Sequence, residues 1–204
     1  FADSRFQVLS ELTRLRQLCC DPALVYENYE GGSAKLDLCI ELIQSAVESG
    51  HKILLFSQFT SMIEILTARL QEESISCFVL QGSTKKEQRA QMVEQFNRDD
   101  TSVFCISLKA GGTGLNLTGA DIVIHYDPWW NVAVENQATD RAHRIGQKNV
   151  VTVYKLIAKG TIEEKIIKLQ QMKKELAEEI LSGDEIKTAS FQREELLELL
   201  EERF

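Results

Sequence analysis

Residues 102–107 (SVFCIS) run directly into residues 108–117 (LKAGGTGLNL), and this junction decides the fold. The first part is short, apolar and preceded by the turn Asp99-Asp100, which predicts a buried strand. The second part is rich in glycine, which lets a backbone approach a ligand closely. In parallel α/β sheets, ligands bind at the carboxyl ends of the strands, so we expect a site where this strand ends.

The rest of the chain alternates between strand and helix patterns. Strands are predicted at 52–56, 76–80, 102–107, 121–126 and 150–157. Helices are predicted at 4–19, 34–49, 59–70, 84–97, from 132, at 161–181 and at 194–200. Two of them begin with Thr-x-x-Glu, at Thr84 and Thr161, which predicts capping boxes. This alternation predicts an α/β fold, a parallel sheet with helices on both faces.

The composition is that of an ordinary globular protein. Of 204 residues, 44% are hydrophobic and 26% are charged. No apolar run approaches the length of a membrane span and no secretory signal opens the chain, so we expect no membrane partner and a cytoplasmic location. The five cysteines lack C-x-x-C spacing, which favours reduced, buried thiols. The three histidines are too scattered for a metal site.

The net charge of −8 does not exclude a nucleic-acid partner. Residues 160–204 contain 12 acidic and 7 basic residues, a net of −5, which leaves −3 for the first 159 residues. An acidic protein can still carry a basic groove, because local fields determine binding to a polyanion.

The glycine-rich loop does not hold a nucleotide's phosphates by itself. Gly114 and Gly119 have the spacing of a P-loop, but Ala120-Asp121 follow in place of lysine and a hydroxyl residue. The sequence from Gly112 begins like a dinucleotide fingerprint but lacks its third glycine. This disfavours a nicotinamide-dependent enzyme.

Residues 137–147 (QATDRAHRIGQ) place two arginines three positions apart. We expect the helix from residue 132 to carry Arg141 and Arg144 near its end, so that both point at one target. Ion pairs with Asp140 or Glu135 on a solvated helix face are the alternative. Paired guanidiniums suit phosphate oxygens, and an arginine finger accelerates phosphoryl transfer by ~10³–10⁵.

Five motifs in order make the chain resemble a known family, the C-terminal helicase lobe of the Swi/Snf-type DNA-dependent ATPases. They are 56–59 (FSQF), 80–84 (LQGST), 107–117 (SLKAGGTGLNL), 126–131 (YDPWWN) and 137–147 (QATDRAHRIGQ). The flanks 15–22 and 160–165 also look like that family. These proteins are double-stranded-DNA translocases of helicase superfamily two, and the resemblance covers about residues 5–200.

The resemblance implies that the chain is one of the two lobes of an ATP-driven motor. Two RecA-like lobes hold ATP between them, and the N-terminal lobe carries the P-loop and the carboxylates for Mg²⁺. We therefore expect residues 34–158 to form the second lobe, after a helical lead-in (1–33) and before a brace helix and short final helix (159–204). The fragment alone is predicted to bind neither ATP nor Mg²⁺ and to be inactive. Expected partners are the N-terminal lobe, double-stranded DNA and, as a candidate, a DNA-bound protein; in a eukaryote the location would be nuclear.

The resemblance also assigns roles to residues. Arg141 and Arg144 match the arginine fingers. The expected nucleotide-binding residues are Gly112, Gly114, Asn116 and Gln137. The expected DNA-binding residues are Gln58, Ser83, Thr84, Ser107, Lys109 and Trp130.

Three alternatives stay open at this point. Trp130 could pack against the lobe instead of facing DNA, while Trp129 is expected in the core. The long helix from Thr161 could form a coiled-coil or dimer face instead of a brace. The whole chain could be a non-catalytic nucleic-acid or protein-binding module. One departure from the family, Val132 where a proline is usual, leaves the start of that helix undetermined.

Overall fold

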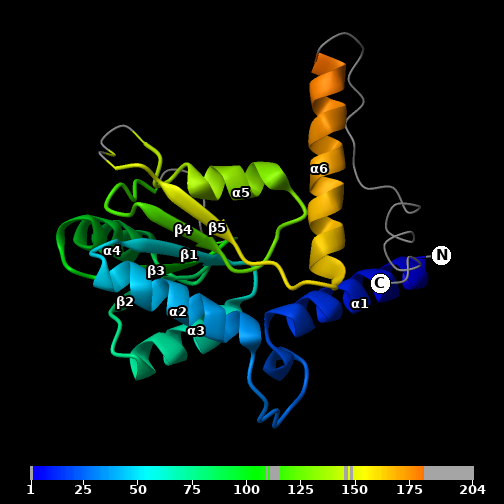
Figure 1. Cartoon of the computed structure of the whole chain (residues 1–204), viewed down its shortest axis with the longest axis horizontal. Coiled ribbons are helices and arrows are strands. Elements are labelled where there is room, and N and C mark those ends of the chain that lie inside the picture. The colour runs from blue at the N-terminus through cyan, green and yellow to red at the C-terminus, as the bar shows by residue number, and fades with distance from the viewer. Residues whose placement is uncertain (1, 109, 111–114, 145–146, 148, 182–204) are drawn as a thin grey trace.

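The computed structural model describes residues 2–108, 110, 115–144, 147 and 149–181 (Figure 1). The elements in order are α1 (Ala2–Cys20), the 3-10 helix η1 (Pro22–Leu24), α2 (Ala34–Glu48), β1 (Ile53–Ser57), α3 (Thr60–Glu72), β2 (Cys77–Leu80), α4 (Lys86–Arg98), β3 (Val103–Ser107), β4 (Ile122–His125), α5 (Val132–Thr139), β5 (Thr152–Lys155) and α6 (Ile162–Leu181). The five predicted strands all form, each a few residues shorter at its ends or shifted by one.

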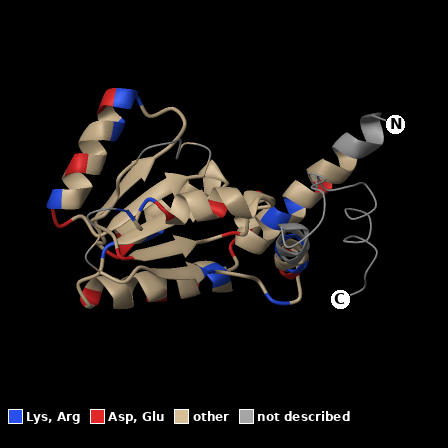
Figure 2. Ribbon diagram, turned by 90° about the horizontal axis from the view of Figure 1, so that it is seen from above, with Lys and Arg blue, Asp and Glu red and all other residues tan. Residues whose placement is uncertain are grey.

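The sheet has five parallel strands in the order β2-β3-β1-β4-β5. At its centre, Ile53 of β1 pairs with Val103 of β3 and Ile122 of β4. Every residue of these three strands is buried, whereas β5 at the edge is exposed along its length. The strands contain a single charged residue, Lys155, and the other charges lie on helices and loops (Figure 2). The continuous apolar runs are those expected of strands covered on both faces.

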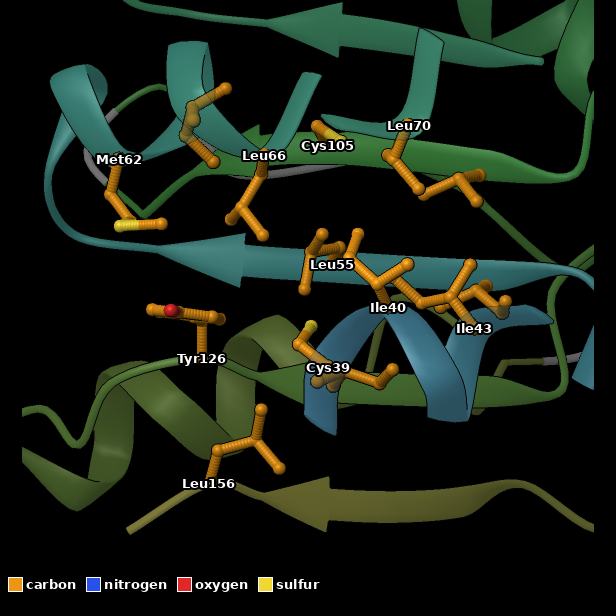
Figure 3. Close-up of a cluster of buried hydrophobic side chains, with 14 of the residues drawn as sticks. Cys39, Ile40, Ile43, Leu55, Met62, Leu66, Leu70, Cys105, Tyr126 and Leu156 are labelled. Atoms are coloured by element: carbon orange, nitrogen blue, oxygen red, sulfur yellow. The ribbon is translucent and has the colours of Figure 1, made fainter. Parts of the chain in front are cut away.

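Helices cover both faces of the sheet, as predicted, because alternate strand residues point to opposite sides. On one face, α2 and α3 pack over Leu55 and Cys105, in the cluster that Figure 3 shows. On the other face, α4 and α5 pack over Leu54 and Phe104. Three of the five cysteines are buried, as expected; these are Cys20, Cys39 and Cys105.

Helix α5 ends earlier than predicted. It begins at Val132, capped by the Asn131 side chain, and ends at Thr139, so the expectation that it carries Arg141 and Arg144 is wrong. After Thr139 the backbone bonds become those of turns: the N–H of Arg141 donates to the carbonyl of Ala138 and that of Ala142 to the carbonyl of Thr139, while the Arg141 carbonyl accepts the N–H of Leu117 at 3.1 Å. Beyond Thr139 the chain continues in turns instead of an α-helix.

The two predicted capping boxes have different outcomes. Thr84 caps no helix: its hydroxyl accepts the N–H of Gln81 at 3.1 Å, and α4 begins two residues later without a side-chain cap. Thr161 does cap α6, because its hydroxyl accepts the N–H of Glu163 at 3.2 Å. The carboxylate of Glu164 accepts the N–H of Gly160 at 3.0 Å, one residue before the expected partner.

Helices α1 and α6 pack against each other beside the lobe, around Leu12, Ile162 and Ile166. From this contact α6 projects away from the sheet (Figure 1). Gln170 on α6 donates to the carbonyl of Trp129 and, at 2.9 Å, to the carboxylate of Glu135 on α5. The domain limits and the roles of α6 remain predictions, and the final helix at 194–200 lies outside the described residues. No described helix is both long and apolar enough to cross a membrane.

Candidate nucleotide and DNA interface

The motifs converge where the strands end. Ser57 ends β1 and pairs in register with Ser107, which ends β3; Phe56 pairs with His125, which ends β4. Because the strands are parallel, the segments that follow them emerge at one edge of the sheet. Hereafter this is called the carboxyl edge.

A buried carboxylate links two of these segments. Asp127, which is 1% exposed, accepts the hydroxyl of Ser57 at 2.5 Å and the backbone N–H of Gln58 at 3.3 Å. Burial raises the pKa of Asp127, while the Ser57 hydrogen bond and the Arg16 charge oppose that shift. The sequence analysis missed Asp127; an acid between a buried strand and a proline was the available signal.

Arg16 on α1 was also missed. Its guanidinium donates to the carbonyl of Pro128 at 2.6 Å and lies 5.7 Å from the ring centroid of Phe59 and 5.1 Å from that of Trp130. Trp130 packs against the α1–α6 contact, and Trp129 packs against the core on the α4–α5 side. This geometry favours the packing alternative for Trp130, and its DNA contact stays a prediction.

The two finger candidates lie in different environments. Arg141 is 5% exposed, and its buried Nη1 atom has no hydrogen-bond partner among the described residues; Arg144 is exposed. Burial, and then the nearby charge of Arg144, lowers the pKa of Arg141 to about 10. The Arg141 guanidinium lies 5.7 Å from the ring centroid of Phe56, at the end of β1. The two cations are therefore neighbours at the carboxyl edge, although no helical turn aligns them.

The alternative of a solvated face with ion pairs fits poorly. Within the described part of the chain, neither arginine is in an ion pair. The expected acid Glu135 lies 3.5 Å from Lys155 and is 1% exposed, and burial raises its pKa. Burying a guanidinium nitrogen without a hydrogen-bond partner destabilises the folded chain, and an anion bound from outside the chain would supply the missing partner.

The glycine-rich loop is anchored from α4. Asn97 donates its amide to the carbonyl of Asn116 and accepts the N–H of Gly119, both at 2.8 Å. A Cβ atom at Gly119 would lie 3.0 Å from Oδ1 and 3.1 Å from Cα of Asn97, so this close approach favours glycine. Asn97 is a further residue that the sequence analysis missed.

The other expected site residues are placed as follows. Asn116, Gln137 and Ser83 are exposed, while Gln58 and Thr84 are partly buried. Ser107 is 2% exposed, and its hydroxyl accepts the N–H of Ala110 at 3.2 Å, which gives it a role within the loop. Lys109, Gly112 and Gly114 lie outside the described residues. All these ligand contacts stay predictions.

The chemistry that the described residues offer is cationic and hydrogen-bonding. Among them, no three His, Cys, Asp or Glu side chains form a group that could hold a metal ion. This part of the chain offers hydrogen-bond donors for an anion. It fits phosphate oxygens, because Arg141 has an unused donor.

Comparison with known proteins identifies the family. The model of the helicase conserved C-terminal domain matches residues 34–146. An uncharacterized ATP-dependent helicase of Mycoplasma pneumoniae is 45% identical over 202 residues, which are 97% of this chain; the chain spans only 19% of that relative's length.

Two solved structures from Sulfolobus solfataricus are similar. The C-terminal domain of its SWI2/SNF2 ATPase is 33% identical with a TM-score of 0.73, over 95% of this chain and 81% of that one. The SWI2/SNF2 ATPase core in complex with double-stranded DNA is 37% identical with a TM-score of 0.71, over 87% of this chain and 38% of that one. The chain therefore belongs to the helicase C-terminal domain family, as a RecA-like C-terminal lobe of the SWI2/SNF2 type.

Proposed function

We propose that this chain is the second motor lobe of an ATP-dependent double-stranded-DNA translocase. ATP, bound by the P-loop of an N-terminal lobe, closes the cleft between the lobes and brings Arg141 and Arg144 to the γ-phosphate. Hydrolysis then releases the second lobe, and the cycle moves it along the DNA backbone. The ATP-dependent helicase relative and the DNA-bound structural relative support this assignment.

One observation carries the catalytic part of the proposal: the buried Nη1 of Arg141 has no partner, and Arg144 lies beside it. Charge develops on the equatorial oxygens of a transferred phosphoryl group, and preorganised cations stabilise it. Arg144, which is exposed, is the better placed of the two to reach a second lobe. We expect carboxylates of that lobe to hold Mg²⁺, together with the phosphates of ATP.

The DNA part of the proposal rests on the other motifs of the carboxyl edge. Gln58, the turn at Ser83-Thr84 and the loop after Ser107 offer amides, hydroxyls and backbone N–H groups. Such donors bind phosphates without reading sequence. A motor that moves along DNA needs contacts of this kind, and a DNA-bound protein would be the obstacle on which it acts.

The first test is Arg144→Ala in the full-length protein. We expect DNA-stimulated ATP hydrolysis to fall by about 10³-fold or more, because the finger acts on the transition state. ATP binding, measured with a fluorescent analogue, should stay within about threefold, since the P-loop holds the nucleotide.

The matched control is Arg98→Ala, an arginine on the exposed face of α4 whose side chain is 78% exposed. Its turnover should equal that of the unaltered protein. Normal DNA-stimulated turnover by Arg144→Ala would end the finger assignment. Turnover by the purified 204-residue chain alone would show that it contains a nucleotide site of its own.

A further inference from the structure

One side chain at the carboxyl edge binds an unusual number of backbone carbonyls. Arg89, on the first turns of α4, donates to the oxygens of Thr84 at 2.8 Å, Gln81 at 3.2 Å and Gly82 at 3.1 Å. Its Nη1 atom donates to the oxygen of Ala110 at 2.7 Å. All three guanidinium nitrogens of Arg89 donate to backbone carbonyl oxygens.

The four carbonyls belong to two separate segments. Three are in the turn 81–84, which follows β2, and the fourth is in the loop that follows β3 and lies 21 residues from Arg89. β2 and β3 are neighbouring parallel strands, so both segments leave the same edge of the sheet. Arg89 is thus a cross-link between them.

Four of the six expected DNA-binding residues lie in or directly before these segments in the sequence. Ser83 and Thr84 are in the first. Ser107 ends β3 just before the second, and Lys109, which lies outside the described residues, follows it. In a planar trans peptide, the C=O and N–H groups point in opposite directions. The bond from Arg89 to the Gly82 carbonyl therefore turns the N–H of the exposed Ser83 away from Arg89.

We propose that Arg89 is a positioning residue, which sets the separation and orientation of the turn 81–84 and the loop at Ala110 so that both meet one DNA backbone. This inference rests on the proposed function for its DNA part. Arg89 acts through the two segments and makes no phosphate contact itself. A guanidinium carries five N–H donors in a fixed planar fork, which lets Arg89 bind four carbonyls at once; a lysine ammonium has three donors on one nitrogen and cannot reproduce that arrangement.

The first experiment measures amide hydrogen exchange by mass spectrometry in the full-length protein without DNA. The variants are Arg89→Ala and Arg89→Lys, with Arg98→Ala on the same helix as control. We expect faster exchange in peptides from both segments in the two Arg89 variants, and no change in peptides from β1 and β4 or in the control. Faster exchange in the turn 81–84 alone, or in neither segment, would refute the cross-link.

The second experiment measures the DNA concentration that gives half-maximal stimulation of ATP hydrolysis, at several salt concentrations. Both Arg89 variants should raise that concentration by about tenfold, because misplaced contacts bind poorly. If Arg89→Lys instead binds DNA like the unaltered protein, Arg89 is a phosphate contact and the proposal is wrong.

The two experiments separate the proposals. Where the unaltered protein shows no stimulation by DNA, the proposed function fails, while the exchange measurement still decides whether Arg89 joins the two segments. A global rise in exchange, including β1 and β4, would reduce Arg89 to a general contribution to folding and would also overturn the inference.

Discussion

Two buried cations in this protein have opposite environments. Lys35 on α2 lies 2.6 Å from Glu163 on α6, and the two side chains are 8% and 0% exposed. Arg141 is also buried, yet its Nη1 atom has no partner. The first cation is satisfied within the chain, whereas the second has an unused donor.

The difference distinguishes a buried charge that stabilises the fold from one that the proposed function would use. The Lys35–Glu163 pair fastens the start of α6 to α2, and the backbone N–H of Ala158 adds a bond to Glu163 at 2.8 Å. Burial raises the pKa of Glu163, and the ammonium of Lys35 opposes that shift. Arg141 has a pKa lowered to about 10 by burial and by Arg144, and no carboxylate among the described residues compensates. The phosphate of the proposed function would supply that missing anion.

The largest expected effect is that of Arg141→Met. DNA-stimulated hydrolysis by the full-length protein should fall by ~10³–10⁵. The melting temperature of the purified chain should stay the same or rise, because a buried atom without a partner is removed. Calorimetry of the Arg141→Met variant measures the change in melting temperature, and a turnover assay of the same variant measures the loss of ATP hydrolysis. A lower melting temperature with normal turnover would assign Arg141 to folding instead.

The paired cation should behave in the opposite way. Glu163→Ala leaves the Lys35 ammonium buried and unpaired, so the free energy of unfolding should fall by ~3–5 kcal/mol. The double variant Lys35→Met/Glu163→Leu should regain most of that loss. Urea unfolding of the purified chain measures both. Equal losses in the single and double variants would show that the unpaired Lys35 charge is not the source of the loss.

Acid provides a third and smaller test, through His125. It is 1% exposed and stacks on the ring of Phe56, and burial, with a smaller contribution from Lys155, lowers its pKa from 6.5 to about 4. Between these pH values the unfolded chain binds the extra proton, so stability should fall as pH drops from 6.5 to about 4. The full effect is about 3 kcal/mol.

The check is the difference between the unaltered chain and His125→Gln in urea unfolding across that range. Asp127 and Glu163, whose pKa values burial raises, act in the opposite direction and are common to both proteins. The difference therefore isolates His125. Parallel stability curves for the two proteins would contradict the assignment.

Much of the fold followed from local pattern. Apolar runs predicted the five strands, and the alternation with helices predicted the parallel sheet, because these patterns depend on neighbouring residues alone. The end of α5 did not follow; the turns beyond it include Arg141, whose carbonyl binds Leu117, more than twenty residues earlier in the chain. The failed cap at Thr84 has a local cause: its hydroxyl accepts the N–H of Gln81 within a tight turn.

The motifs of the candidate site could be predicted from the sequence, but the side chains that hold those motifs in place could not. The arginines and the glycine-rich loop stood out by composition. Asp127 and Arg89 did not, because their partners lie at or after the ends of neighbouring strands. Arg16 is 112 residues from the carbonyl that it binds, a separation at which no sequence pattern operates.

The sequence by itself determined the parallel α/β sheet, the edge at which the motifs meet and the kinship with the SWI2/SNF2 lobe. Periodicity and ordered motifs encode these properties directly. Only the tertiary structure decided which buried charges have partners. Lys35 pairs with Glu163, 128 residues away in the sequence. Arg141 is buried beside Phe56, and its Nη1 atom has no partner among the described residues. Pairing of buried charges depends on distances between packed elements, and those exist only once the chain has folded.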